Sequence, residues 1–174
     1  NFGQPLYIGQ DLERSMKRNE LDVKIRQSRE MPFVQGNCYW YGYQILENTG
    51  GVADQLKRGA HRAKALIPPY THLHQGAPGK VKRLAQVFTE DMHFLTWEAR
   101  KDPNNPEAAR EFVIYRFDAG EKIDISRAEK IVAVTSDNFY LLPYEGGRNR
   151  YTYVVTALDA FKNEGKGAKI KVVL

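Results

Sequence analysis

The sequence predicts an α+β chain in two parts, an N-terminal α/β segment followed by an all-β sandwich. Along residues 79–174 apolar and polar residues alternate, which is the period-2 pattern of β-strands. Along residues 1–78 short apolar runs are separated by helix-like segments. The stretch 68–79 between them contains adjacent prolines and two glycines, which end a helix and favour turns. We therefore expect one unit over residues 1–78 and a second over 79–174.

The N-terminal part is predicted to run in the order strand, helix, strand, helix. The two strands are expected over residues 6–11 and 31–42, and the helices over 19–25 and 52–66. This alternation is the repeating unit of an α/β sheet with parallel strands. Two parallel strands alone leave both sheet edges open, so the pattern indicates part of a larger structure.

The C-terminal part is predicted to contain seven short strands separated by turn residues. Asp, Asn, Pro and Gly are the residues that favour these turns. Seven such strands are typical of a β-sandwich built from two sheets. The strands are expected over residues 81–88, 93–98, 112–117, 131–134, 139–142, 151–157 and 169–174.

Two strands of this sandwich supply its expected core. Leu95 and Trp97 share one face of the second strand, where the large indole ring can fill a small core. On the sixth strand, four apolar or aromatic residues recur at a spacing of two and face inward together. The first of them is in position for a tyrosine corner, in which the hydroxyl bonds to the chain upstream. These four residues are Tyr151, Tyr153, Val155 and Ala157.

Composition and charge are those of an ordinary globular protein. Hydrophobic residues make up 42% and charged residues 27% of the chain. The net charge of +5 is spread over both halves and interspersed with acidic residues. A nucleic-acid-binding surface gathers its basic residues into a patch or stripe. We therefore expect no nucleic-acid partner.

Metal, cofactor and thiol chemistry are not indicated. The single cysteine, Cys38, lies in an apolar and aromatic stretch that predicts a buried thiol. His72 and His74 are two residues apart with no acidic residue or cysteine close in sequence, so no metal site is expected. His61 is expected on the solvent-facing side of the second helix. No phosphate-binding or dinucleotide-binding glycine motif is present, and no cofactor is expected.

Motifs in both parts resemble known proteins. The C-terminal part contains Leu95-Thr-Trp97, Phe112-Val-Ile-Tyr-Arg116 and Tyr151-x-Tyr153-x-Val155-x-Ala157-x-Asp159. In this order they resemble a fibronectin type III domain of a bacterial extracellular enzyme. The N-terminal part contains Leu6-Tyr-Ile-Gly-Gln-Asp11, Val34-Gln-Gly-Asn-Cys-Tyr-Trp40, Gly51-Val-Ala-Asp54 and Ala65-Leu-Ile-Pro-Pro-Tyr70. These four motifs resemble the end of the bacterial family-10-like glycosyl hydrolase lipoproteins.

The resemblance implies a fold and a function. In that family a (β/α)₈ barrel is followed by a fibronectin type III-like domain. Residues 1–78 would be the last two strand–helix units, with about six units preceding them in a complete barrel. The chain would be the C-terminal fragment of a bacterial glycoside hydrolase whose sandwich is a spacer or accessory module. The resemblance also implies a carbohydrate partner through the parent protein, and export to the periplasm or outer membrane as a lipoprotein.

Polar and aromatic residues near the predicted strand ends are the candidate substrate-binding residues. Carboxylates and amides hydrogen-bond sugar hydroxyls, and exposed aromatic rings stack on sugars. The alternatives are a helix cap for the carboxylate, local backbone bonds for the amides and interior packing for the rings. One carboxylate cannot be both acid and nucleophile, so no catalysis by the fragment alone is expected and its catalytic residues stay unassigned. The candidates are Gln10, Asp11, Gln35, Asn37, Trp40 and Tyr41.

Two other functions are compatible with the sequence. The chain is alternatively a stand-alone extracellular module that binds glycan or protein at a loop end or sheet edge. In a related hypothesis Trp40, Tyr41 and Tyr43 form a carbohydrate platform. An exposed barrel-remnant surface on residues 1–78 would also favour a homodimer.

Overall fold

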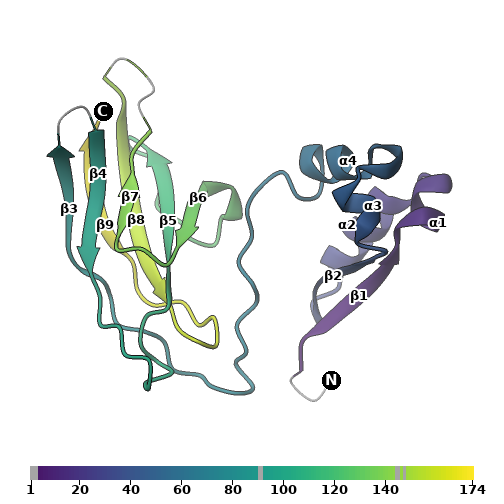
Figure 1. The fold of residues 1–174 in the computed structure, drawn as a ribbon, viewed down its shortest axis with the longest axis horizontal. Coiled ribbons are helices and arrows are strands. Elements are labelled where there is room, and N and C mark those ends of the chain that lie inside the picture. The colour runs from purple at the N-terminus through teal and green to yellow at the C-terminus, as the bar shows by residue number, and fades with distance from the viewer. Residues whose placement is uncertain (1–3, 90–91, 144–145, 147) are drawn as a thin grey trace. The chain divides into compact units, whose positions relative to one another are not determined.

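The computed structural model describes residues 4–89, 92–143, 146 and 148–174, and the chain divides into two compact units between Pro68 and Pro69 (Figure 1). The division precedes the one expected at residue 78 because the intervening segment is bonded to the sandwich. The amide of Tyr70 donates to the carbonyl of Phe161 at 2.9 Å. Residues 69–78 therefore form a strap that belongs to the second unit.

The first unit alternates strands and helices, in the order that the sequence predicts. The strands β1 and β2 pair in parallel, from Leu6 beside Val34 to Asp11 beside Trp40. Parallel pairing requires a crossover, which the first two helices provide. The elements are β1 (Leu6–Asp11), α1 (Leu12–Lys17), α2 (Leu21–Glu30), β2 (Val34–Trp40), α3 (Tyr43–Leu46), the 3₁₀ turn η1 (Thr49–Gly51) and α4 (Val52–Arg58).

The helices of this unit pack on one face of the two-stranded sheet. Leu21 and Ile25 of α2 are four residues apart and both fully buried, so α2 presents one apolar stripe. They join Leu12, Val52 and Leu56 in a single core, against which Tyr39 of β2 packs. The core of the first unit thus lies between the helices and one side of the sheet.

The last helix is shorter than the sequence suggests. Residues 52–66 are predicted as one helix, but α4 ends at Arg58. Gly59 follows with φ −105° and ψ −107°, which lies outside the helical region, although its amide still donates to the carbonyl of Gln55. The Ala- and Lys-rich residues beyond it therefore continue as turn and extended chain.

The second unit contains the seven strands that the alternation predicts. They form a three-stranded antiparallel sheet, β3-β4-β7, and a four-stranded antiparallel sheet, β6-β5-β8-β9 (Figure 1). The strands are β3 (Lys82–Thr89), β4 (Met92–Glu98), β5 (Glu111–Asp118), β6 (Ile131–Thr135), β7 (Phe139–Leu141), β8 (Arg150–Leu158) and β9 (Ala168–Val173), with a 3₁₀ turn η2 (Ala128–Lys130) before β6.

The sandwich core lies between the two sheets. Leu95 and Trp97 of β4 meet residues of β5 and β8, and the Trp97 ring contacts Phe112 edge-on at 5.3 Å between centroids. Tyr153, Val155 and Ala157 of β8 are completely buried there. Tyr151 is only partly buried, since it lies near the start of β8 with the Arg116 guanidinium 4.7 Å above its ring.

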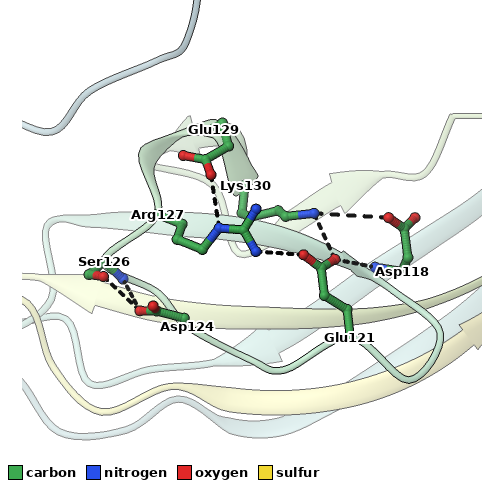
Figure 2. A network of polar contacts seen from close by, with 7 residues as sticks. All are labelled: Asp118, Glu121, Asp124, Ser126, Arg127, Glu129 and Lys130. Carbon is green, nitrogen blue, oxygen red and sulfur yellow. Dashed lines mark hydrogen bonds and ion pairs between the residues drawn. The ribbon is translucent and has the colours of Figure 1, made fainter.

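A polar network fixes the loop between β5 and β6 (Figure 2). The Glu121 carboxylate accepts hydrogen bonds from Lys130 Nζ at 2.6 Å, Arg127 Nη1 at 2.7 Å and the Asp118 amide at 3.0 Å. These donors, led by Lys130, lower the pKa of Glu121 to about 2. Lys130 also lies 5.9 Å over the buried ring of Phe117, so the network holds this loop next to the outer face of β5.

Candidate functional site

The face of the β1–β2 sheet opposite the helices carries two exposed aromatic rings. Side chains alternate along each strand, so Tyr7 and Asp11 of β1 share this face with Cys38 and Trp40 of β2. Tyr7 is 41% exposed and Trp40 is 43% exposed. Cys38 is exposed as well, which corrects the expected buried thiol, because it projects away from the helices. We call this side the bare face.

Both rings lie against glycines of the neighbouring strand. A Cβ on Gly9 would sit 2.2 Å from Cζ3 of Trp40, and a Cβ on Gly36 would sit 3.1 Å from Cδ1 of Tyr7. A glycine inside a strand permits this kind of close approach. The bare face therefore offers aromatic rings seated directly on the backbone of the sheet.

Asp11 and Trp40 are register partners at the carboxyl ends of the two parallel strands. In α/β sheets with parallel strands, ligands bind beyond these ends. One carboxylate oxygen of Asp11 accepts the amide of Arg14 at 2.9 Å, so Asp11 also caps α1. The cap that the sequence offered as an alternative is thus present, and it fixes the carboxylate beside Trp40.

Arg14 lies next to Asp11 and Trp40 at one hollow in the surface. Asp11, Arg14 and Trp40 all line a hollow of about 360 Å³ that continues along the outer side of β1. Asp11 and Arg14 also line a second hollow, of about 340 Å³, together with Arg18. We call Asp11, Arg14 and Trp40 the strand-end site.

The predicted amide candidates lie outside the strand-end site, although Gln10 contributes to the lining of the larger hollow. Gln10 is buried on the helix-covered face, where its Nε2 donates to Oδ1 of Asn37 at 2.8 Å. A longer contact of 3.5 Å joins the same nitrogen to Ser28 Oγ. Gln35 is exposed but lies at the opposite end of β2 from Trp40. For Gln10 and Asn37 the geometry favours local pairing over sugar binding.

Tyr41 does not line the hollow of the strand-end site and packs against Tyr43 instead. Its ring stacks on Tyr43 with centroids 6.0 Å apart and an interplanar angle of 24°. Both rings are exposed. They form an aromatic pair just beyond β2, next to Trp40 in the chain but outside the hollow that Trp40 lines.

The histidines take part in pairs. His61 follows the end of α4, and its Nε2 lies 2.6 Å from the Tyr39 hydroxyl, so it is not on the solvent face of a helix as expected. Burial, aided by the nearby Arg29 cation, lowers the pKa of His61. His74 Nε2 lies 2.9 Å from Oε1 of Glu107, a carboxylate that is distant in sequence.

The part of the chain that the structure describes contains neither a metal-binding cluster nor a helix suited to a membrane. In the described residues, no group of three or more His, Cys, Asp and Glu side chains could hold a metal ion. The described helices include none with the length and apolar character needed to span a bilayer.

Sequence reasoning missed Arg14 and Tyr7. Arg14 enters the strand-end site because α1 begins immediately after Asp11, and a helix over residues 12–17 is not indicated by apolar periodicity. Tyr7 was detectable in principle, since Gly9 and Gly36 inside predicted strands signal the close approach of a large group.

One curated protein gives a weak sequence similarity. No protein-family model matches the chain. The chain is 25% identical over 148 residues to the glycosyl hydrolase YngK of Bacillus subtilis (strain 168). The matched region is 84% of this chain and 28% of that relative, so the chain spans less than a third of the relative's length. It is thus weakly similar to part of a glycosyl hydrolase.

Solved structures resemble about half of the chain. They include an FN3tt mutant, with 16% identity, a TM-score of 0.41 and coverage of 55% of this chain and 93% of that one. The spore cortex lytic enzyme SleM of Clostridium perfringens matches with 12% identity, a TM-score of 0.37 and coverage of 56% and 28%. The glycoside hydrolase domain of Endo-D from Streptococcus pneumoniae R6 matches with 13% identity, a TM-score of 0.41 and coverage of 57% and 16%.

Proposed function

We propose that this chain is the C-terminal part of a bacterial glycoside hydrolase. In this proposal the first unit is the end of a (β/α)₈ barrel, and the second is a fibronectin type III-like accessory or spacer module. The observation that carries the proposal is the bare face, with Trp40 seated on Gly9 beside Asp11 at the carboxyl ends of parallel strands. The similarity to part of YngK points in the same direction.

The two faces of the first unit fit the two sides of a barrel wall. In a (β/α)₈ barrel each strand packs against helices on its outer side and lines the barrel interior on the other. Here Gln10 and Tyr39 face the helices, whereas Tyr7 and Trp40 lie on the bare face. Within the described chain β1 and β2 pair only with each other, so each has one unpaired edge at which a further strand would add.

The strand-end site supports sugar binding more than complete catalysis. An indole ring packs against the apolar face of a sugar, and a carboxylate accepts its hydroxyl hydrogens. Glycoside hydrolysis ordinarily requires two carboxylates across the scissile bond. Asp11 supplies one carboxylate at this site, so the proposal assigns turnover to the longer parent protein and not to this chain alone.

The remaining parts of the proposal rest on the family resemblance. They are the carbohydrate partner and export to the periplasm or outer membrane as a lipoprotein. A homodimer is proposed only for this chain without the preceding barrel strands, since its bare face is then an uncovered aromatic sheet surface that favours association of two copies.

A stand-alone glycan-binding module is the second candidate function. The stacked pair of Tyr41 and Tyr43 favours it, because both rings are exposed and need no further barrel strand to be complete. In that case Tyr41→Ala would abolish glycan binding, whereas Trp40→Ala would leave it unchanged.

Hydrolysis of a glycan panel by the native protein tests the leading proposal. We expect turnover of at least one glycan, and a loss of about tenfold or more in kcat/KM for Trp40→Ala through lost stacking. Phe33→Ala is the matched control, since Phe33 is also exposed but precedes the opposite end of β2. No hydrolysis of any glycan, or equal losses in the two variants, would contradict the proposal.

A further inference from the structure

Arg14 is a cation at the strand-end site with no acidic partner among the described residues. Its amide is held by Asp11, while its side chain is exposed and lines both hollows beside that carboxylate. An arginine that is not paired within the protein keeps its five donors available to a ligand. The site therefore combines an aromatic ring with an uncommitted guanidinium.

The neighbouring lysines differ from Arg14 in this respect. Lys17 pairs with Glu13 at 2.6 Å, and Lys24 pairs with Glu20 at 2.9 Å. Arg18, like Arg14, forms no ion pair within 4 Å among the described residues, although its charge helps to lower the pKa of Glu20, after the larger effect of Lys24. The two arginines are four residues apart, so they share one side of this short helical segment and line the same hollow. Because Lys17 and Lys24 are paired with glutamates, the charges of Arg14 and Arg18 exceed that of Asp11 and leave net positive charge next to Trp40.

We infer that the strand-end site binds a sugar that carries an anionic group, and this inference rests on the proposed function. Trp40 stacks on the sugar ring, and Asp11 accepts one of its hydroxyl groups. The Arg14 guanidinium pairs with the anionic group, because its planar fork matches a carboxylate with two parallel hydrogen bonds. Arg18 adds electrostatic attraction from the adjoining hollow.

Only the part of the hollow next to Asp11 and Trp40 is assigned to the ligand. The hollow beside Trp40 has a volume of about 360 Å³, at the lower end of the range for ligand sites. Its remaining length follows the outer side of β1, past Ile8 and Gln10, where a further barrel strand would pair. The ligand is therefore assigned to the end of the hollow beyond Asp11.

Binding of matched sugars to the present chain tests this inference. The probes are trigalacturonate, its fully methyl-esterified neutral form and a sulfated trisaccharide, followed by the indole N–H signal of Trp40 in NMR titrations. We expect the acid to bind about tenfold more tightly than its neutral ester, as for a charge-assisted hydrogen bond. Preference for the sulfated sugar would identify a sulfate ester instead of a carboxylate as the anionic group.

Two arginine variants separate a specific contact from general charge. Arg14→Ala is expected to weaken binding of the preferred anionic sugar about tenfold. Arg26→Ala is expected to leave it nearly unchanged, since Arg26 is an exposed arginine of α2 that lines neither hollow. Equal binding of acid and ester, equal losses in the two variants, or no binding of any probe would overturn the inference.

The two proposals fail in distinguishable ways. Hydrolysis of neutral glycans that depends on Trp40, without any preference of the chain for anionic sugars, would overturn the inference alone. Specific binding of an anionic sugar through Arg14, without hydrolysis by the native protein, would overturn the hydrolase and retain the site.

Discussion

Trp97 lies at the centre of the sandwich core, in edge-on contact with Phe112. Trp97→Ala should lower the free energy of unfolding by about 3–5 kcal/mol, through lost burial and the cavity left behind. Trp97→Phe should cost less, because the buried indole Nε1 has no hydrogen-bond partner among the described residues and its loss breaks no bond there. Urea denaturation of both variants checks this order, and the opposite order would contradict the core assignment.

Gly9 determines how Trp40 sits on the bare face. An alanine Cβ would lie 2.2 Å from the Trp40 ring, so Gly9→Ala must displace the indole. Gly42→Ala is the control, since Gly42 has helical φ and ψ angles and open space where a Cβ would be. In a Trp97→Phe background Trp40 is the only tryptophan, so under selective tryptophan excitation its emission should change for Gly9→Ala alone. Unchanged emission would place the ring elsewhere.

At this scale the sequence predicted residue types better than residue partners. Asp11 and Trp40 were candidates because they lie near the ends of predicted strands, and the structure brings them together at the strand ends. Gln10 and Asn37 were equally plausible by type, but strand alternation and α2 place them on the covered face. Arg14 escaped notice because its role depends on a helix that starts directly after the strand.

Ionisation of Glu121 in the β5–β6 loop should make the stability of the folded chain depend on pH. The pKa of Glu121 falls from 4.5 to about 2 in the folded chain. The ionised carboxylate therefore contributes fully to the free energy of unfolding above pH 4.5, and this contribution is lost as the pH falls toward 2. Glu121→Gln should therefore lower the melting temperature relative to wild type at neutral pH, with a difference that shrinks between pH 4.5 and pH 2. Melting curves across this range measure it.

The control for this loop is an exposed ion pair. Glu98 pairs with Arg83 at 2.8 Å, and both side chains are more than half exposed. Glu98→Gln should change the melting temperature little at any pH, since exposed pairs contribute little. A deficit of Glu121→Gln that is the same at pH 2.5 and pH 7 would show that its carboxylate is not ionised through the network.

The sequence did not predict that the strap, residues 69–78, belongs to the second unit. Besides the bond from Tyr70, Nδ2 of Asn163 donates to the His74 carbonyl at 3.2 Å. Limited trypsin digestion should therefore cut at Arg62 or Lys64, and spare Lys80, which lies two residues beyond the strap. The sandwich fragment should begin at residue 63 or 65. A fragment that begins at Val81 would contradict an ordered strap.

Asn163→Ala provides the matched comparison for the strap. The substitution removes the bond to His74 and a second bond to the buried Asp159, so it should expose Lys80 to trypsin. Proline spacing marked residues 68–79 as a junction, but these bonds join residues nearly a hundred positions apart. Such pairing is not visible in local sequence, which explains why the division was expected at residue 78.

At the scale of the whole molecule, the sequence predicted where strands form. It did not predict which faces of the first unit's strands are covered. Short apolar runs bounded by turn residues identified all seven sandwich strands, and β5 and β8 among them bury residues on both faces. Helix length failed at Gly59, where one backbone conformation overrides helix-forming neighbours. The bare face became visible only when register and helix placement were combined, since composition alone does not tell which side of a strand is covered.

The intact mass of the native protein from its source cells tests the hydrolase proposal most directly. A complete (β/α)₈ barrel needs about 250 residues. With the sandwich added, we expect a native mass of roughly twice the 20.0 kDa of this chain, or more. A native mass near 20.0 kDa would contradict the barrel, and would leave a glycan- or protein-binding module as the function to be explained.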